Sequence, residues 1–261
     1  TSTELVSLLG GTDYEFTIEA VSESGVSELC QTITQSTAPG NPRGLHAVYQ
    51  STHSLVLAWE APVWDAASSR GAEPGLQTTG YQLYRNDGHA GLSLSTVGYD
   101  GRNVLALTGT ALDLTPGLTY DFTVSALSGA GESDVSAVIS VSTTPDHVLN
   151  VASIHQTSTS IHLSWIEPPL TGGAEVTGYR IYRDEGFGLP ASTVCYNGLG
   201  LTTTQRMISD LQPGRLYSFI ITALSSSGEG VESSVFRQST ASAPPLAPVS
   251  VHQTMTTLTL S

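Results

Sequence analysis

The sequence predicts an all-β chain of tandem, seven-stranded antiparallel β-sandwiches, and three observations support this fold class. Short runs alternate apolar and polar residues with a period of two, whereas stripes of helical period are nearly absent. Turns rich in Gly, Asn and Asp separate the runs. The whole pattern recurs about every 100 residues, a spacing that allows seven strands per repeat.

Alternation along three runs of the chain identifies strands that bury one face. Residues 120–126 carry apolar or aromatic side chains at every second position, and residues 217–223 and 14–20 repeat this pattern. Successive side chains of a strand point to opposite sides of the sheet, so one face of each run packs against the core and the other is mostly exposed to solvent. Such strands are typical of a β-sandwich.

Two aromatic anchors recur in phase and define the repeat. A tryptophan ends an alternating strand at Trp59 and again, 106 residues later, at Trp165. A leucine stands six positions before a tyrosine three times, at Leu8 and Tyr14, Leu114 and Tyr120, and Leu211 and Tyr217. We predict that these side chains, together with Tyr81 and Tyr179, form the structural core.

Proline-containing seams separate the repeats. They lie at residues 36–39, 143–145 and 239–245, where Pro removes a ladder donor and stiffens a short linker. The seams predict four segments: the C-terminal part of a sandwich at 1–38, complete sandwiches at 39–144 and 145–241, and the N-terminal strands of a further one at 242–261.

The ordered series of motifs resembles the fibronectin type III module, an immunoglobulin-like sandwich, over the whole chain. Residues 80–85 and 178–183 look like the third strand of that module. The pattern Leu-x-Pro-Gly-x-x-Tyr at 114–120 and 211–217 looks like its tyrosine corner, in which a buried tyrosine bonds nearby backbone through its hydroxyl. The first copy has Gly-Gly where the others have Pro-Gly, and we expect the corner to survive there.

The last residues of the chain align with the strand that precedes each tryptophan. Residues 257–261 match 54–58 and 160–164, both of which are followed by tryptophan. We therefore expect tryptophan to follow Ser261 in the parent protein.

Composition argues against several classes of protein. Charged residues make up 12% and hydrophobic residues 39% of the 261, which disfavours charged disorder and a membrane-spanning segment. The formal net charge is -14. Because an acidic surface repels phosphate groups, we expect no binding to nucleic acid or to an anionic membrane surface, and the composition predicts no membrane insertion of this segment.

The two cysteines, Cys30 and Cys195, lie 165 positions apart in different predicted modules. A metal site needs clustered ligands and a disulfide framework needs several pairs, so neither is indicated. The resemblance likewise implies no disulfide between the sheets. We expect Cys30 on a last strand and Cys195 on a middle strand, each as a small, partly buried hydrophobe, with an intermolecular crosslink as the alternative.

No catalytic, cofactor-binding or metal site is predicted. None of the seven histidines has another His or a Cys at metal-ligand spacing. The glycine-rich turns follow strands but open no helix, so they do not form a phosphate-binding loop. The acidic turns at 87–88, 100–101 and 184–186 offer one or two carboxylates each, which hairpin turns explain better than a calcium loop.

Three aromatic residues are the candidate interaction sites. Trp64 lies in the loop 61–79, which is eight residues longer than the corresponding loop of the next module. Loops at the ends of a sandwich commonly bind partners, and Trp is enriched among the residues that dominate binding energy at protein interfaces. The Trp64 side chain can equally fold back onto its own sandwich. Tyr84 and Tyr182 are one position out of phase with the inward residues, so each faces outward as a contact or as cross-strand cover.

We expect a non-enzymatic structural or adhesive spacer array of a large multi-module protein, outside the cell or on its surface. It would act through protein–protein contacts or filament assembly, with other chains or further modules of the same protein as partners. The adhesive tripeptide of the family, Arg-Gly-Asp, is absent. The alternatives are a protein or glycan recognition module that uses the Trp64 loop, an accessory array of a larger enzyme, and a ciliary or cytoskeletal component.

Overall fold

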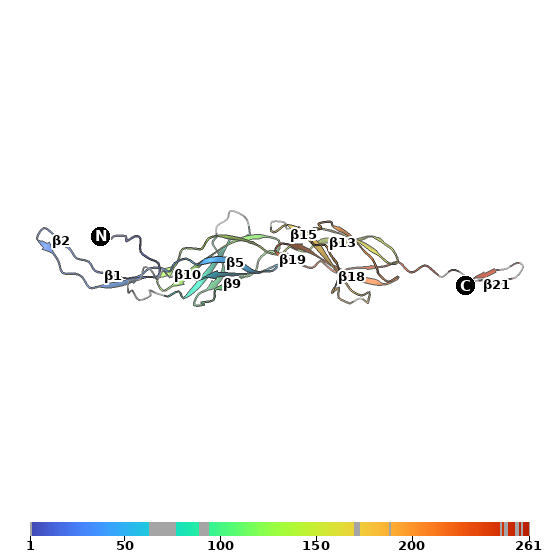
Figure 1. Cartoon of the computed structure of the whole chain (residues 1–261), viewed down its shortest axis with the longest axis horizontal. Coiled ribbons are helices and arrows are strands. Elements are labelled where there is room, and N and C mark those ends of the chain that lie inside the picture. Colours follow the sequence, from blue (N-terminus) through green and yellow to red (C-terminus); the bar gives the residue numbers. More distant parts are fainter. Residues whose placement is uncertain are drawn as a thin grey trace. The chain divides into compact units, whose positions relative to one another are not determined.

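The computed structural model describes residues 2–62, 77–88, 94–169, 173–187, 189–245, 247, 250–253, 256 and 258–260. Every element of regular secondary structure in this part of the chain is a β-strand, as the alternation predicts (Figure 1). The chain divides into two compact units, residues 1–146, 170–176 and 224–231 in one and residues 147–169, 177–223 and 232–261 in the other. Each unit is centred on one β-sandwich.

Two antiparallel sheets form the first sandwich. Its strands are β5 (Arg43–Gln50), β6 (Leu55–Glu60), β7 (Gly80–Arg85), β8 (Thr96–Gly101), β9 (Thr108–Ala111), β10 (Thr119–Ser128), β11 (Gly131–Glu132) and β12 (Ile139–Ser142). One sheet has the order β5-β6-β9 and the other has the order β12-β10-β7-β8, while β11 closes a hairpin onto the end of β10.

The core of the first sandwich follows the period of two in its strands. On β6 the side chains of Leu55, Leu57 and Trp59 are buried, and the intervening residues are only half-buried. Tyr81 from the opposite sheet places its ring 5.5 Å from that of Trp59. Such an aromatic pair adds about 0.5–1.5 kcal/mol beyond the area that it buries, so this contact is a main link between the two sheets.

The second sandwich repeats the arrangement. Its strands are β13 (Leu149–Gln156), β14 (Ile161–Ile166), β15 (Val176–Arg183), β16 (Thr193–Asn197), β17 (Gln205–Ile208), β18 (Leu216–Ser225), β19 (Gly228–Glu229) and β20 (Phe236–Ser239). The sheets have the orders β13-β14-β17 and β16-β15-β18, and β20 also pairs with β18. Trp165 and Tyr179 are buried with their rings 5.2 Å apart, as in the first core.

Residues near the two ends of the chain form strand pairs. The strands are β1 (Asp13–Phe16), β2 (Val21–Ser22), β3 (Gly25–Val26), β4 (Ile33–Ser36), β21 (Ser250–Gln253) and β22 (Leu258–Leu260), paired as β1 with β4, β2 with β3 and β21 with β22. Leu8 is 38% exposed and Tyr14 is half-buried, although the sequence places both in a core. The reason is that β1 and β4 form a two-stranded sheet, and no second sheet of the described residues covers it.

The tyrosine corner forms three times. In each copy the backbone amide five residues before the tyrosine donates to its hydroxyl at 2.7 or 2.8 Å: Leu9 to Tyr14, Thr115 to Tyr120, and Gln212 to Tyr217. The glycine three residues before each tyrosine has φ of 65° or 66°, a region in which L side chains are strained. The Gly-Gly sequence of the first copy therefore supports the same corner as Pro-Gly, because only the second residue of the pair has to be glycine.

A threonine from each proline-containing seam closes the corner. The buried hydroxyl of Thr143 donates to the carbonyl oxygen of Thr115 at 2.8 Å and accepts from the amide of Leu118 at 3.1 Å. The other seams repeat these two bonds, from Thr240 to Gln212 and Arg215 and from Thr37 to Leu9 and Thr12. The seams thus belong to the folded sandwiches as well as joining them.

Replacing Thr143 with valine should lower the free energy of unfolding of the first sandwich by about 1–3 kcal/mol, because two backbone groups lose their partner. Thr144→Val is the matched control, since the hydroxyl of Thr144 is buried and has no hydrogen-bond partner among the described residues. Urea titrations of both variants measure the difference. An equal loss from both would contradict the role assigned to Thr143.

Candidate interaction surface of the first sandwich

Three connections of the first sandwich are packed together at one of its ends. The amide of Thr79 donates to the carbonyl oxygen of Leu127 at 2.7 Å, which ties the loop before β7 to the β10–β11 hairpin. A Cβ atom on Gly80 would clash with the carbonyl oxygen of Gly101, at the start of the β8–β9 connection. The ends of these connections therefore form a fixed frame.

The β8–β9 connection presents apolar side chains from this frame. Val104, Leu105 and Leu107, which we call the apolar turn, are 43%, 66% and 41% exposed. The carbonyl oxygen of Leu107 accepts the amide of Trp59 at 3.0 Å, and the amide of Val104 donates to Gly101 at 3.0 Å. The apolar turn was not predicted from the sequence, although the run Val-Leu-Ala-Leu in a turn region indicates it.

Trp64 lies outside the described residues, which stop at 62 and resume at 77. Its contact role therefore stays a prediction. The described end of its loop, at Thr79, belongs to the same frame as the apolar turn.

Tyr84 holds an acidic side chain on the outer face of its sheet. Its hydroxyl donates to Oε1 of Glu132 at 2.6 Å, and the hydroxyl of Ser125 donates to the same oxygen at 2.5 Å. Burial, together with the hydrogen bond to Glu132 and its negative charge, raises the pKa of Tyr84 to about 12. Tyr84 thus remains a neutral donor at physiological pH and ties β7 to the β10–β11 hairpin.

The raised pKa gives a pH-dependent contribution to stability. Because the pKa of Tyr84 in the folded chain exceeds its ordinary value of 10.0, this contribution is complete below pH 10 and is lost as the pH rises through about 12. The difference between the ultraviolet titrations of the wild type and Tyr84→Phe should show a midpoint near 12. Glu132→Gln should move this midpoint down toward 10, and a wild-type midpoint near 10 would contradict the contact.

Tyr182 is half-buried on β15 and lies opposite Val194 of β16. Its neighbours Ile181 and Tyr179 are buried, so the strand's phase places Tyr182 on the outer face as predicted from the sequence. This pairing favours the interpretation that Tyr182 covers its sheet by packing against the facing Val194 side chain. Tyr182 and Tyr84 belong to different units.

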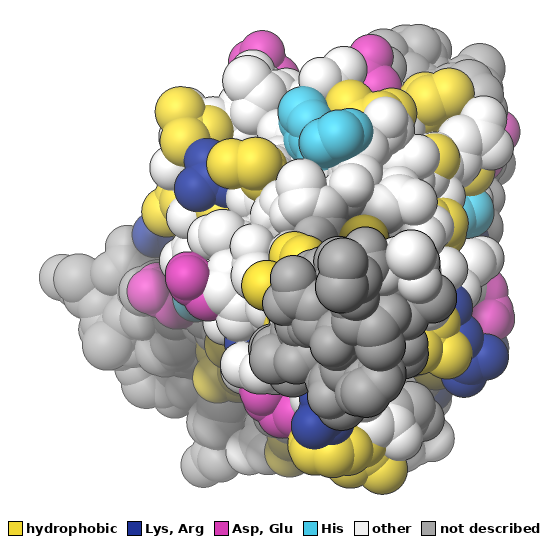
Figure 2. All heavy atoms as spheres, turned by 90° about the vertical axis from the view of Figure 1, so that its right-hand side faces the viewer, with side chains coloured by type: hydrophobic (Ala, Val, Ile, Leu, Met, Phe, Trp, Pro, Cys, Tyr) yellow, Lys and Arg dark blue, Asp and Glu magenta, His cyan; other side chains and the backbone are white. Residues whose placement is uncertain are grey.

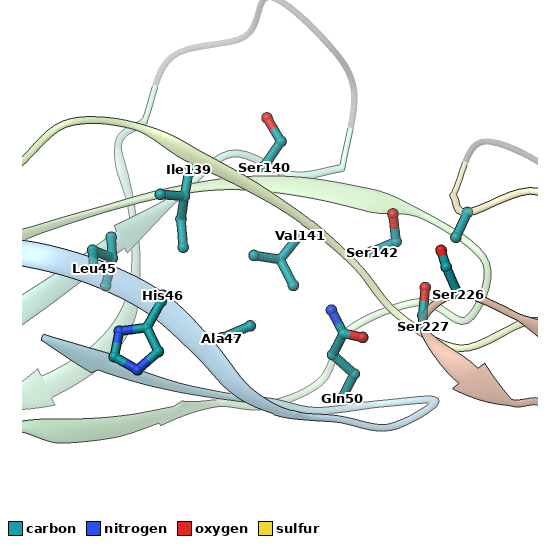
Figure 3. Close-up of a pocket in the computed structure, with 11 residues that line it drawn as sticks. Leu45, His46, Ala47, Gln50, Ile139, Ser140, Val141, Ser142, Ser226 and Ser227 are labelled. Atoms are coloured by element: carbon teal, nitrogen blue, oxygen red, sulfur yellow. The ribbon is translucent and has the colours of Figure 1, made fainter.

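A pocket of about 420 Å³ opens between β5 and β12, which belong to different sheets (Figure 3). Leu45 and Ala47 of β5 lie across from Ile139 and Val141 of β12, while the side chain of Ser140 points away. His46 on the rim bonds through Nδ1 to the carbonyl oxygen of Gly44 at 2.7 Å. This pocket is an open gap between the two sheets of the first sandwich, with an apolar floor, and we assign no reaction to it.

Cys30 takes the place of a structural serine. It lies between β3 and β4, before the last strand rather than on it, and its sulfur accepts the amide of Ile18 at 3.1 Å. In the first sandwich the hydroxyl of Ser136 accepts the amide of Val124 in the same way, also at 3.1 Å. The thiol of Cys30 is exposed and forms no disulfide.

Cys195 lies on β16, a middle strand of its sandwich in chain order and an edge strand of its sheet. Its thiol is partly buried, and this burial raises its pKa to about 11. The thiolate is the reactive form, so this cysteine is a poor nucleophile near neutral pH.

Carboxylates of two acidic turns accept backbone amides, from the distant strand β18 at Asp184 and from within the turn at Asp100. Oδ1 of Asp184 accepts the amide of Ser218 at 2.9 Å, and Oδ1 of Asp100 accepts the amide of Arg102 at 3.2 Å. Among the described residues, no group of three or more His, Cys, Asp or Glu side chains is placed to hold a metal ion. The same residues include no helix long and apolar enough to cross a membrane.

Comparison with known proteins points to one family. The model of the Fibronectin type III domain matches residues 40–142 and 146–239. The chain is 31% identical over 203 residues to Chitinase A1 of Niallia circulans, which covers 74% of this chain and 24% of that protein. It is 28% identical over 248 residues to mouse Receptor-type tyrosine-protein phosphatase F, which covers 90% and 12%.

Other relatives and structures extend the comparison. Human Myomesin-2 is 27% identical over 238 residues, which covers 85% of this chain and 15% of that protein. The crystal structure of the chicken CNTN1 FN1-FN3 domains has a TM-score of 0.43 at 19% identity and covers 90% of this chain and 80% of that chain. The chain spans no more than about a quarter of the curated relatives named here.

Proposed function

The chain belongs to the fibronectin type III family, and we propose that it is a non-enzymatic array that spaces and displays surfaces within a larger protein. The observation that carries this proposal is the repetition of a self-contained sandwich. Trp59 and Trp165 are each buried in their own core, and each sandwich closes its own tyrosine corner. A unit of this kind brings its own stability, so units can be joined in series.

The placement of the array is part of the same proposal. We favour a position outside the cell or on its surface, because the chain matches 90% of its length to a receptor-type phosphatase. The match to Myomesin-2 supports a cytoskeletal placement as the alternative, and the match to Chitinase A1 supports an accessory array attached to an enzyme. Protein–protein contacts are the proposed mode of action in each case.

Mechanical unfolding of the full chain tests the array directly. Pulling on the two ends should give a separate event for each complete sandwich, with each event releasing roughly 300 Å of chain, since about 100 residues extend by at most about 3.5 Å each. One event that released both lengths together would contradict a series of independent units.

Recognition through the loop 61–79 is the second candidate function. It is favoured by the apolar turn, which exposes Val104, Leu105 and Leu107 from the same end of the sandwich. Exposed apolar groups on a fixed frame are typical of binding surfaces, and Trp64 would supply the aromatic anchor. Deletion of 64–71 should then weaken binding while the melting temperature stays nearly unchanged.

Sedimentation with insoluble chitin tests the glycan form of this candidate. A recognition module should pellet with chitin, and Trp64→Ala should leave the protein in solution, whereas Tyr49→Ala should not. Tyr49 is the matched control because it is an exposed aromatic residue on β5. A wild-type chain that stays in solution would exclude chitin as the ligand and favour the spacer.

A further inference from the structure

Two histidines face each other across the three-stranded sheet of the second sandwich. In the antiparallel pair of β13 and β14, His155 lies directly opposite His162. Residues so placed share one face of a sheet, with Cβ atoms about 5 Å apart. Ile161 and Leu163 on either side of His162 are buried, so His162 and its partner lie on the outer face. His155 is exposed and His162 is half-buried.

A β-bulge brings the two histidines into register. Ser153 pairs with Leu163 and His155 pairs with His162, so Ile154 is the extra residue of the bulge. In the first sandwich, an equivalent bulge brings Tyr49 opposite Val56. The fold itself therefore does not require histidine at either position, and the pair is a property of the second sandwich.

Both imidazoles of the pair are available as ligands. Neither one has a hydrogen bond or an ion pair within the described part of the chain. In contrast, His46 and His53 of the first sandwich each bond a backbone carbonyl oxygen through Nδ1, at 2.7 and 3.0 Å. Histidine also reaches the surface beside hydrophobic side chains in the view of Figure 2.

The surroundings of the pair tolerate a cation. The next outward positions on β14 and β17 are Ser164 and Gln205, which are uncharged. Arg206 pairs with Leu163 in the opposite phase, and its guanidinium stacks over the ring of Tyr196 at 4.2 Å. The net charge of -14 attracts cations to the chain as a whole.

We propose that His155 and His162 chelate a late first-row divalent metal ion, with copper(II) bound most tightly. Imidazole suits copper, zinc and nickel, and the Irving–Williams order places copper(II) first. Two ligands on one rigid face act together, because the second binds at the high effective concentration set by the first. Met207 lies opposite His162 on β17 and is exposed, so a soft thioether stands beside the proposed ion.

Copper(II) titration of the full chain tests this site. The Cys30→Ser variant serves as the parent protein, since the exposed thiol of Cys30 would itself react with copper. Calorimetry should show one tight equivalent of copper(II), with zinc(II) and nickel(II) weaker. His155→Ala and His162→Ala should each weaken this binding about a hundredfold or more, because a single imidazole loses the chelate gain.

His46→Ala is the matched control, because His46 lies on β5 opposite Ala58 and has no facing imidazole. It should retain the tight equivalent. Paramagnetic copper(II) should also broaden the amide signals of Ser164 and Met207 before those of Ser142 in the first sandwich. Absence of a tight equivalent, or equal binding by His162→Ala and the parent, would overturn the proposal. Unchanged tryptophan fluorescence shows that each variant is folded.

Discussion

Replacing Trp165 with alanine is expected to unfold the second sandwich and leave the first one folded. Trp165 is buried and packs against Tyr179 with ring centroids 5.2 Å apart. Truncation of a buried tryptophan costs about 3–5 kcal/mol. A whole domain is stable by only about 5–15 kcal/mol, so this one change removes a large share of the stability of its sandwich.

Denaturant titration of the full chain measures this effect. After Trp165→Ala, tryptophan fluorescence should keep the transition of the Trp59 core, while circular dichroism should gain an early second transition. Trp165→Phe is the matched control: it keeps most of the ring volume and removes an indole N–H that is buried without a partner among the described residues. It should lose far less stability than the alanine variant. Equal losses would show that packing of the ring is not the cause.

Gly178→Ala is expected to have the second largest effect. A Cβ atom at this position would clash with the carbonyl oxygen of Gly198 and would lie 3.1 Å from the Cα atom of Leu199. These are backbone atoms, so the strands must separate to make room. Overpacking of this kind costs up to about 3 kcal/mol. Gly80 meets Gly101 in the same way in the first sandwich.

Thermal unfolding compares this variant with Gly98→Ala. Gly98 also lies in a strand, but its added Cβ atom would meet only side-chain atoms, at 3.5 Å or more. Its melting temperature should therefore change little, whereas Gly178→Ala should lower the melting temperature of the second sandwich by several degrees. Similar melting temperatures for the two variants would contradict the close approach of β15 and the β16–β17 connection.

The period of two, the repeat of about 100 residues with its aromatic anchors, and the resemblance to the fibronectin type III module were together sufficient to predict the fold and most of the core. Burial of Trp59, Trp165 and the later tyrosine corners depends on patterns that lie within one strand or turn. Burial of Leu8 depends instead on an opposing sheet, which the local pattern does not report. The seam around Thr143 was predicted as a boundary, but its bonds to the corner depend on residues 25 and 28 positions away.

The interaction surfaces were harder to predict because they combine distant segments. Tyr84 was expected to face outward, yet its partner Glu132 is 48 residues away in the sequence. His155 and His162 do not have the spacing of a metal motif, and a bulge at Ile154 decides that they meet. Register shifts of one residue reverse the face of a side chain, so such pairs require the structure.

Each sandwich should fold by itself, and two-dimensional amide NMR of the full chain distinguishes the two sandwiches residue by residue. With Trp165→Ala, we expect the dispersed signals of the first sandwich, such as Val124, to stay in place while those of the second, such as Ile221, collapse. With Trp59→Ala we expect the reverse. Loss of both sets of signals in either variant would show that the sandwiches do not fold independently.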